Sequence, residues 1–282
     1  MSGKLFVVGT PIGNLSDFSP RAIETLKAVD FIAAEDTRVT LKLLNRFEIS
    51  TPMVSYHKFN THDKGEEICR RLENGENCAI VTDAGMPCIS DPGEILVRQC
   101  AERNIPVCVV PGPTALASAL AVSGLPTGRF AFEGFLSVNK PGRREHLLSL
   151  LNEERTMIFY EAPHKLAATL RDMYQCFGNR RIAIVRELTK VHEEVIRTTL
   201  EEAAEKYADG SVKGEIVLIL EGAVKPVTDG GTLEDAVQIA AELCEKGSPP
   251  SDAAREVARL TGYKKGDIYR QLLALQNKND EG

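Results

Sequence analysis

The feature that most limits the possible folds is a series of short apolar runs, each closed by polar, glycine or proline residues and followed by a helical pattern. Apolar runs cover residues 4–9, 31–34, 78–82 and 105–110, and helical patterns cover 20–28, 37–46 and 94–103. Buried parallel strands have this apolar character, and their alternation with helices indicates an α/β layer. We therefore predict a mostly parallel sheet, with ligands bound beyond the carboxyl ends of its strands.

Beyond residue 120 the pattern changes to closely spaced strands with fewer helices. The predicted strands are 130–135, 156–160, 181–185, 194–199 and 215–220, and the predicted helices are 143–151 and 164–176. We expect a mixed sheet here. A turn-rich linker at 224–231 then precedes three short helices. The predicted domains are 1–120, 121–224 and 225–282.

The tail from residue 232 has the pattern of a helix-turn-helix unit. Six basic and three acidic residues lie within 251–278, an excess of three positive charges. Such a patch can attract phosphates, but a small helical cap with solvated charges explains it equally well.

Composition excludes several classes of protein. The net charge of −6 argues against a molecule that binds nucleic acid over its whole surface. The seven cysteines form no CxxC pair, so we expect free thiols and no zinc site. No apolar run approaches the ~18–20 residues that cross a bilayer, and the opening MSGKLFVVGTPIGN does not fit a signal peptide. We therefore expect a cytoplasmic protein.

The common catalytic motifs are absent: the sequence lacks GxGxxG, GxxxxGK[ST], HExxH and GxSxG. What remains is three loops rich in glycine and proline, at residues 9–14, 82–93 and 110–115, each directly after an apolar strand. Glycine permits close backbone approach to a ligand, and proline stiffens a turn. Any one of these loops is most simply an ordinary turn, but three in one half predict a shared ligand cleft.

Six motifs carry a resemblance to a known family: GTPIGNLSD (9–17), EDTR (35–38), TDAGMPCISDPG (82–93), VPGPTA (110–115), FYEAPH (159–164) and RELTKVHEE (186–194). Together they resemble the tetrapyrrole methylase superfamily, and within it the branch that methylates a cytidine 2′-hydroxyl of 16S rRNA. Porphyrin-modifying relatives usually carry GxGxGD-like and GGDP-like loops, where this chain has GTPIGN and DAGMP. The resemblance implies a two-lobed class III methyltransferase fold with a C-terminal helix-turn-helix domain.

The resemblance also implies ligands and partners. The methyl donor would be S-adenosylmethionine, with S-adenosylhomocysteine as product and no metal. The implied substrate is a nucleotide of the decoding region of 16S rRNA within the 30S subunit, and the implied assembly is a homodimer. The residues that match the donor site are Pro11, Asp83, Ala84, Gly85, Met86, Cys88, Thr114, Ala115, Tyr160 and Ala162.

A ribose hydroxyl needs a base or a charge stabiliser to attack a methyl group. Lys190 with a lowered pKa, or Glu187 beside it, is the first candidate; a surface ion pair is the alternative. His57 is the second candidate, because imidazole titrates near neutral pH; a structural histidine is equally compatible. The candidate substrate contacts are Asn14, Asp36, Arg38, Asn60, Arg143, Arg144, Glu161, His164 and Arg186.

Basic and aromatic residues suggest how RNA would be held. The loop NKPGRR at 139–144 precedes a helix and is a candidate phosphate clamp. Phe59 is a candidate for stacking on an unpaired base. Two other functions stay open: a methyltransferase for a porphyrin-like small molecule, and a non-catalytic helix-turn-helix regulator with an α/β sensor domain.

Overall fold

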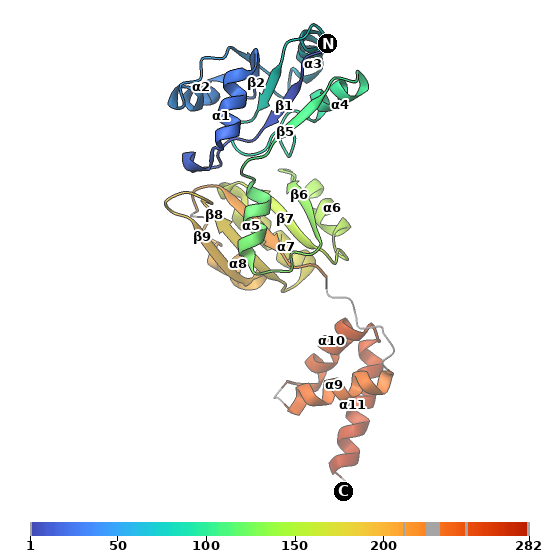
Figure 1. The fold of residues 1–282 in the computed structure, drawn as a ribbon. Helices are drawn as coiled ribbons and strands as arrows, with labels where there is room; N and C mark the ends of the chain where they lie inside the picture. Colours follow the sequence, from blue (N-terminus) through green and yellow to red (C-terminus); the bar gives the residue numbers. More distant parts are fainter. Residues whose placement is uncertain (1, 211, 224–231, 246–247, 281–282) are drawn as a thin grey trace. The chain divides into compact units, whose positions relative to one another are not determined.

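The computed structural model describes residues 2–210, 212–223, 232–245 and 248–280. They form two compact units (Figure 1). The larger unit holds residues 1–151 and 155–221, and the smaller unit holds residues 152–154 and 222–282. The larger unit contains two five-stranded sheets, which divide it into an N-terminal and a C-terminal lobe.

The N-terminal sheet is wholly parallel, with the strand order β3-β2-β4-β1-β5. Its strands are β1 (Leu5–Val8), β2 (Phe31–Ala34), β3 (Met53–Ser55), β4 (Cys78–Val81) and β5 (Val107–Val110). The three central strands are short and almost fully buried, as their apolar sequences require. The predicted parallel sheet is therefore confirmed.

Helices cover both faces of this sheet (Figure 1). One face packs against α1 (Pro20–Ala28) and α2 (Thr37–Arg46), and the other against α3 (Thr61–Glu73) and α4 (Glu94–Glu102). Helix α1 begins as predicted, because the Ser19 hydroxyl accepts a hydrogen bond from the Ala22 amide. A short 3-10 helix, η1 (Leu15–Asp17), joins the first loop to α1.

The C-terminal sheet is mixed, as expected, with the order β6-β7-β10-β8-β9. Strands β6 (Phe130–Phe135) and β7 (Thr156–Glu161) are parallel. Strands β8 (Arg181–Arg186), β9 (Glu194–Thr199) and β10 (Ile216–Leu220) form the antiparallel pairs. The carboxyl ends of β6, β7 and β8 and the start of β10 consequently lie at one edge of the sheet.

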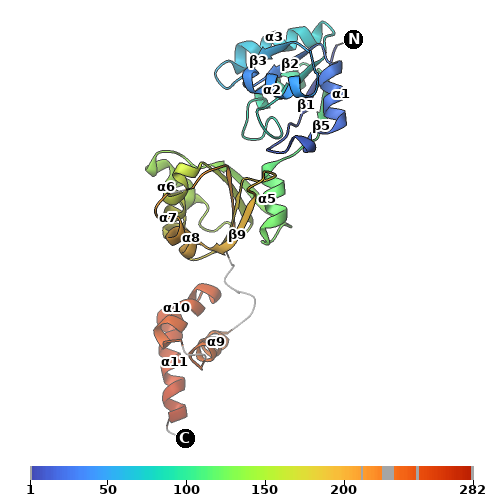
Figure 2. The same ribbon diagram turned by 90° about the vertical axis from the view of Figure 1, so that its left-hand side faces the viewer.

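Helix α5 (Ala115–Ser123) packs on one face of the mixed sheet, through Ala119 and Leu120. The other face is covered by α6 (Lys140–Ser149), α7 (Leu166–Phe177) and α8 (Leu200–Lys206), with the short 3-10 helix η2 (Pro163–Lys165) before α7 (Figure 2). The boundary expected near residue 120 thus falls inside a helix that belongs to the second sheet.

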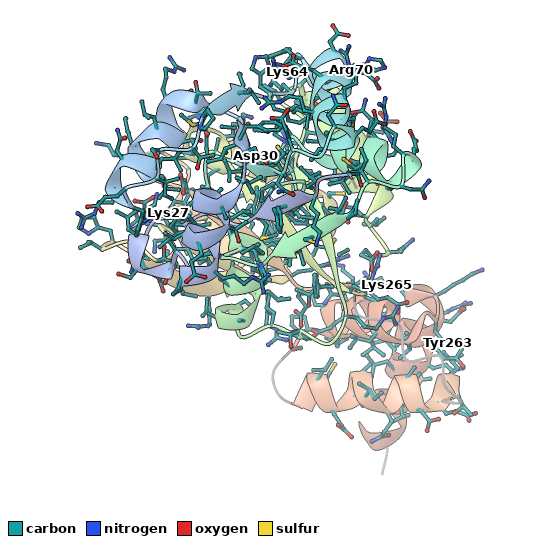
Figure 3. The ribbon with its side chains drawn as sticks, turned by 45° about the horizontal axis from the view of Figure 1, so that its top comes forward. Lys27, Asp30, Lys64, Arg70, Tyr263 and Lys265 are labelled. Atoms are coloured by element: carbon teal, nitrogen blue, oxygen red, sulfur yellow. The ribbon has the colours of Figure 1, made fainter. Side chains whose placement is uncertain are left out.

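The smaller unit is helical. It contains α9 (Leu233–Glu245), α10 (Pro250–Thr261) and α11 (Lys265–Asp280), whose apolar faces enclose a small core. Gly262 ends α10 in a left-handed conformation, as the sequence predicts. Lys265 lies at the start of α11 (Figure 3). Its ammonium donates to the Ser251 hydroxyl, at the start of α10, over 3.1 Å. Helix α10 begins at Pro250, so Ser251 lies in its first turn.

Several segments of regular structure were not predicted from the sequence, among them β3, α3 and α8. Strand β3 is three residues long, and helix α3 has a strongly polar sequence, THDKGEEICRRLE. The linker predicted at 224–231 lies outside the described residues. Within the described ranges, no helix is long and apolar enough to cross a membrane.

Candidate active site

The three loops rich in glycine and proline follow β1, β4 and β5, which are adjacent in the sheet. Their carboxyl ends lie at the same edge, so the loops meet there. Thr10 and Gly85 exchange backbone hydrogen bonds of 2.9 and 3.2 Å, which join the first loop to the second. The Thr10 hydroxyl also donates to the Thr82 carbonyl over 3.1 Å.

The first and third loops touch through two glycines. A Cβ placed on Gly112 would lie 2.9 Å from both the Cα and the carbonyl carbon of Gly9. A Cβ on Gly9 would lie 2.7 Å from the Gly112 Cα and from Met86 Sδ. Real side chains do not reach such distances, so both positions need glycine for this close backbone approach.

A cavity of about 480 Å³ lies beside these loops. The N-terminal lobe supplies Ile12 and the tips of the second and third loops. The C-terminal lobe supplies the edge where β6, β7 and β8 end and β10 starts, including Phe135, Tyr160 and Leu188. The volume and the largely apolar lining are those of a site for a small molecule or cofactor.

Eight of the ten predicted donor-site residues line this first cavity: Asp83, Ala84, Gly85, Met86, Thr114, Ala115, Tyr160 and Ala162. Pro11 and Cys88 do not. Pro11 is buried, and its neighbour Ile12 faces the cavity instead. Cys88 packs against the core of the N-terminal lobe, where burial raises the pKa of its thiol to about 11.

A second cavity, of about 650 Å³, adjoins the first and lies wholly in the N-terminal lobe. His57, Lys58, Phe59 and Thr61 line one side. The His57 Nδ1 atom is buried and has no hydrogen-bond partner among the described residues. The Phe59 side chain is 84% exposed, and Lys58 Nζ lies 4.9 Å from the centre of its ring.

Four residues line both cavities: Glu35, Asp83, Ser90 and Asp91. We call them the shared wall. Three of the four are acidic: Glu35 follows β2, and Asp83 and Asp91 belong to the loop after β4. Burial, reinforced by the Glu35 carboxylate, raises the pKa of Asp83. Burial, together with Glu35 and Asp83, raises the pKa of Asp91 to about 6.

Asp36 lies next to this wall and also lines the second cavity. Arg38 binds its carboxylate in a bidentate pair, with nitrogen–oxygen distances of 3.0 and 2.6 Å. These hydrogen bonds hold the pKa of Asp36 well below its usual range. The Arg38 side chain is otherwise 87% exposed, so Arg38 stays open to an outside contact at the rim.

The prediction that Lys190 has a lowered pKa is wrong. Its ammonium lies 2.9 Å from Glu187 Oε1 and 3.1 Å from Glu215 Oε2. Burial alone would lower the pKa of Lys190, but hydrogen bonds to these two carboxylates outweigh it and raise the pKa. The Glu215 amide and Lys190 in turn lower the pKa of Glu187. Lys190 is therefore a protonated cation, joined to the first cavity through its wall residue Glu215.

Four other predicted substrate contacts lie outside both cavity linings: Asn14, Asn60, His164 and Arg186. Asn14 and Asn60 cap backbone, since they accept hydrogen bonds from the amides of Ser16 and His57. His164 is exposed on η2. Arg186 pairs with Glu194 over 3.0 Å.

Glu161 does line the first cavity, but its side chain is committed to the fold. Its carboxylate is buried and accepts hydrogen bonds from the Thr169 hydroxyl (2.5 Å) and the Ala162 amide (2.8 Å). These bonds fix the end of β7, which carries Tyr160 into the cavity wall.

Arg143 cannot act as a phosphate contact, contrary to the sequence-based expectation. Its guanidinium is buried and pairs with Asp172 over 2.7 Å, and it also donates to the carbonyls of Ser137 and Val138. It joins α6 to α7 inside the lobe. Arg144, the next residue, is exposed, and its proposed contact with RNA stays a prediction.

We expect Arg143→Ala to lower the free energy of unfolding by about 3–5 kcal/mol, because Asp172 would be left as an unpaired charge in a largely buried position. Urea denaturation followed by circular dichroism measures this loss. Arg144→Ala is the matched control and should change the free energy by less than about 0.5 kcal/mol. Equal effects of the two substitutions would contradict the structural role of Arg143.

Several lining residues were not predicted from the sequence. They include Ile12, Glu35, Thr82, Ile89, Ser90, Asp91, Leu116, Leu188 and Glu215. Four of these residues lie inside the motifs described above: Glu35, Thr82, Ser90 and Asp91. Their position in loops that follow strands could have identified them as lining residues. No sequence feature indicated that Glu215 lines the cavity, because the pattern of its segment indicates only an apolar strand.

Two family models match the chain. Tetrapyrrole (Corrin/Porphyrin) Methylases match residues 4–204, and the RsmI C-terminal HTH domain matches residues 231–276. A crystal structure of uroporphyrin-III C-methyltransferase from Thermus thermophilus, complexed with S-adenyl homocysteine, shares the fold at a TM-score of 0.53 and 18% identity. The match covers 78% of this chain and 97% of that one. The fold and the cleft thus define a two-lobed methylase.

Closer relatives narrow the class. Ribosomal RNA small subunit methyltransferase I of Synechocystis sp. is 47% identical over 97% of this chain and 99% of that protein. The protein of the same name from Xylella fastidiosa is 46% identical over 95% of this chain and 98% of that protein. The chain belongs to the tetrapyrrole methylase family and, within it, to the family of ribosomal RNA small subunit methyltransferase I.

Proposed function

We propose that the protein transfers a methyl group from S-adenosylmethionine to the 2′-hydroxyl of a cytidine in the decoding region of 16S rRNA, within the 30S subunit. The observation that carries the proposal is the pair of adjoining cavities. One has the size and lining suited to a small donor, and the other opens beside exposed aromatic and basic side chains. The family membership of the chain supports the same reading.

The residues of the first cavity fit this donor. The close approach of Gly9 and Gly112 holds the first and third loops together beside this cavity. The Thr114 hydroxyl accepts a hydrogen bond from the Ala117 amide and caps α5, and the N-terminus of this helix, at the cavity wall, favours a carboxylate. Met86, Leu116 and Tyr160 offer apolar surfaces for an adenine and a thioether chain.

When bound, the donor supplies a methyl group activated by a positively charged sulfur. The acidic shared wall favours a cation at this point, because carboxylates create a negative local potential. The protein then has to hold the ribose oxygen in line with the methyl group and accept its proton. Orientation of this kind is worth ~7–11 kcal/mol of the barrier.

The second cavity is proposed to receive the target nucleotide. His57 with its unpartnered Nδ1 would hydrogen-bond the nucleotide, and Lys58 and Arg38 would attract its phosphates. Phe59 offers an exposed aromatic face for an unstacked base.

We expect Phe59→Ala to raise the KM for 30S subunits about 5- to 100-fold, since stacking on an aromatic side chain is worth ~1–3 kcal/mol per base. Donor affinity should not change, because Phe59 lies outside the first cavity. Steady-state kinetics with labelled donor measure both quantities. Leu148→Ala, at an exposed apolar position on α6, is the control. An unchanged KM for Phe59→Ala would remove the stacking role.

The function itself is tested with purified protein, labelled donor and 30S subunits from cells that lack the protein. Mass mapping of the 16S rRNA should find one new 2′-O-methylcytidine, in the decoding region. Methylation of a precorrin-like compound with none of the 30S subunit would establish a small-molecule methyltransferase instead. Binding of duplex DNA without any methyl transfer would indicate a regulator.

The proposal extends to the assembly and the compartment. We propose a homodimer that acts in the cytoplasm, where 30S subunits are found. The edge strand β5 exposes Val107 and Val109, which offers an apolar surface for a second copy. Light scattering after size exclusion measures the mass, and a monomer at micromolar concentration would contradict this part.

A further inference from the structure

The shared wall contains three carboxyl groups that face both cavities, and each has a hydrogen bond within the fold. The Thr82 hydroxyl donates to Glu35 Oε2 over 2.7 Å. The Asp36 amide donates to Asp83 Oδ1 over 3.2 Å. These contacts tie the ends of β2 and β4 together. Thr82 also hydrogen-bonds the Asp91 side chain. No backbone amide among the described residues donates to Asp91, whereas Asp83 accepts one from Asp36.

The loop that carries Asp91 is held in an unusual conformation. Cys88 and Ser90 have φ angles of +72° and +66°, which non-glycine residues rarely adopt. Gly93 closes the loop at φ +137°, and a Cβ there would lie 2.6 Å from Cys88 Sγ. Strained backbone of this kind persists where the surroundings enforce it, and it is concentrated at active sites. The strain keeps Asp91 fixed against both cavities before any ligand binds.

We infer that Asp91 accepts the proton of the attacking ribose hydroxyl. The inference rests on the proposed function. In this step the ribose oxygen forms a bond to the methyl carbon, the carbon–sulfur bond breaks with its electron pair left on sulfur, and the hydroxyl proton passes to a carboxylate oxygen of Asp91. The positive charge of the donor and the negative charge of Asp91 both disappear, so charge and atoms balance.

The charges around Asp91 suit this role. The titratable groups that face it are Glu35 from the end of β2, Asp83 from the end of β4, Cys88 from its own loop and Tyr160 from β7. Burial and the two carboxylates raise the pKa of Asp91 to about 6. A base is most effective when its pKa lies near the working pH. Asp91 is therefore a stronger base than an ordinary aspartate and still ionised at pH 7–8.

The first test needs neither donor nor rRNA. The pKa of Asp91 is about 6 in the folded state, above the usual 3.8. Its contribution to the free energy of unfolding is therefore most favourable at low pH and is lost as the pH rises through about 6. Asp91→Asn should therefore melt about 2–4 °C higher than the wild type at pH 8, with the difference shrinking toward pH 5. The control is Asp63→Asn, a fully exposed carboxylate on α3, which should show no such trend. A melting difference for Asp91→Asn that does not depend on pH would overturn the inference.

The second test measures single-turnover methyl transfer to 30S subunits, with donor affinity measured by calorimetry. Asp91→Asn should slow transfer at saturating donor about 10²–10⁴-fold, a much larger effect than the loss of donor affinity caused by removing one carboxylate of the wall. The wild-type rate should rise with pH to a plateau above about 7, and the variant should lose this dependence. A rate within threefold of the wild type, or a loss explained by weaker donor binding, would overturn the inference. The inference would also be overturned if His57→Asn lost the pH dependence of the transfer rate while Asp91→Asn kept it.

The proposed function and the role of Asp91 are contradicted by different results. If the wild type transfers no methyl group to 30S subunits, the proposed function falls, and this inference falls with it. If the wild type transfers and Asp91→Asn transfers equally well, only the inference falls.

Discussion

Gly112→Ala is expected to weaken donor binding at least tenfold and to slow methyl transfer about 100-fold. The added Cβ would lie 2.9–3.0 Å from three backbone atoms of Gly9. Backbone at the end of a central buried strand cannot move aside as a flexible side chain can, so the first and third loops must separate. A displacement of about 1 Å in a reacting geometry is enough to cost ~100-fold, and overpacking costs ~1–3 kcal/mol in stability.

The measurements are calorimetry with S-adenosylmethionine, single-turnover transfer to 30S subunits and thermal melting. Gly128→Ala is the matched control, because a Cβ at Gly128 meets no atom within 4 Å. It should leave all three quantities close to those of the wild type. If Gly112→Ala bound the donor like Gly128→Ala does, the loops would not form the donor site as we propose.

Lys190→Ala is expected to slow methyl transfer about 10²–10³-fold while donor affinity stays within threefold. Lys190 does not line the first cavity, so donor contacts should survive. Its ammonium, however, balances Glu215 on the cavity wall and Glu187 behind it. Without that cation, uncompensated carboxylates would face the phosphates of the substrate and the negative charge that develops on the attacking oxygen. Losing one such electrostatic contact typically costs 10²–10³-fold in rate.

Lys190→Arg is the control for charge, and it should recover part of the rate, whereas Lys190→Met should not. Single-turnover kinetics at saturating donor separate the rate from the affinity. Turnover by Lys190→Ala at the wild-type level would remove Lys190 from the mechanism. A donor Kd that rises as much as the rate falls would assign it to donor binding instead.

Local sequence patterns predict some elements of this fold, whereas others depend on packing between distant segments. The positions of β1, β2 and β4 could be predicted to within one or two residues, because a buried parallel strand must be apolar and its end must turn. Helix α3 was missed because its polar sequence hides a narrow buried face formed by Ile68, Cys69 and Leu72. A regular helix of that kind is stabilised by packing rather than by its own periodicity.

The errors at the site have one cause. Arg143 was expected to bind phosphate, but its partner Asp172 stands on another helix, 29 positions along the chain. Lys190 was expected to be a candidate base with a lowered pKa, but Glu215 adds a second carboxylate from the start of β10. Charge partners that lie far apart in the chain leave no mark on the local sequence, and they decide both burial and pKa.

The amino-acid order by itself determined the parallel and mixed sheets, the glycine and proline loops at strand ends, and the loop residues that form part of the wall of the first cavity. These features depend on hydrophobic burial and on backbone geometry, which act over a few neighbouring residues. Tertiary structure alone decided that β4 lies between β2 and β1, and that order brings Glu35, Asp83 and Asp91 together. Carboxyl groups so crowded and desolvated hold their protons more tightly, and this chemistry exists only once the strands have paired.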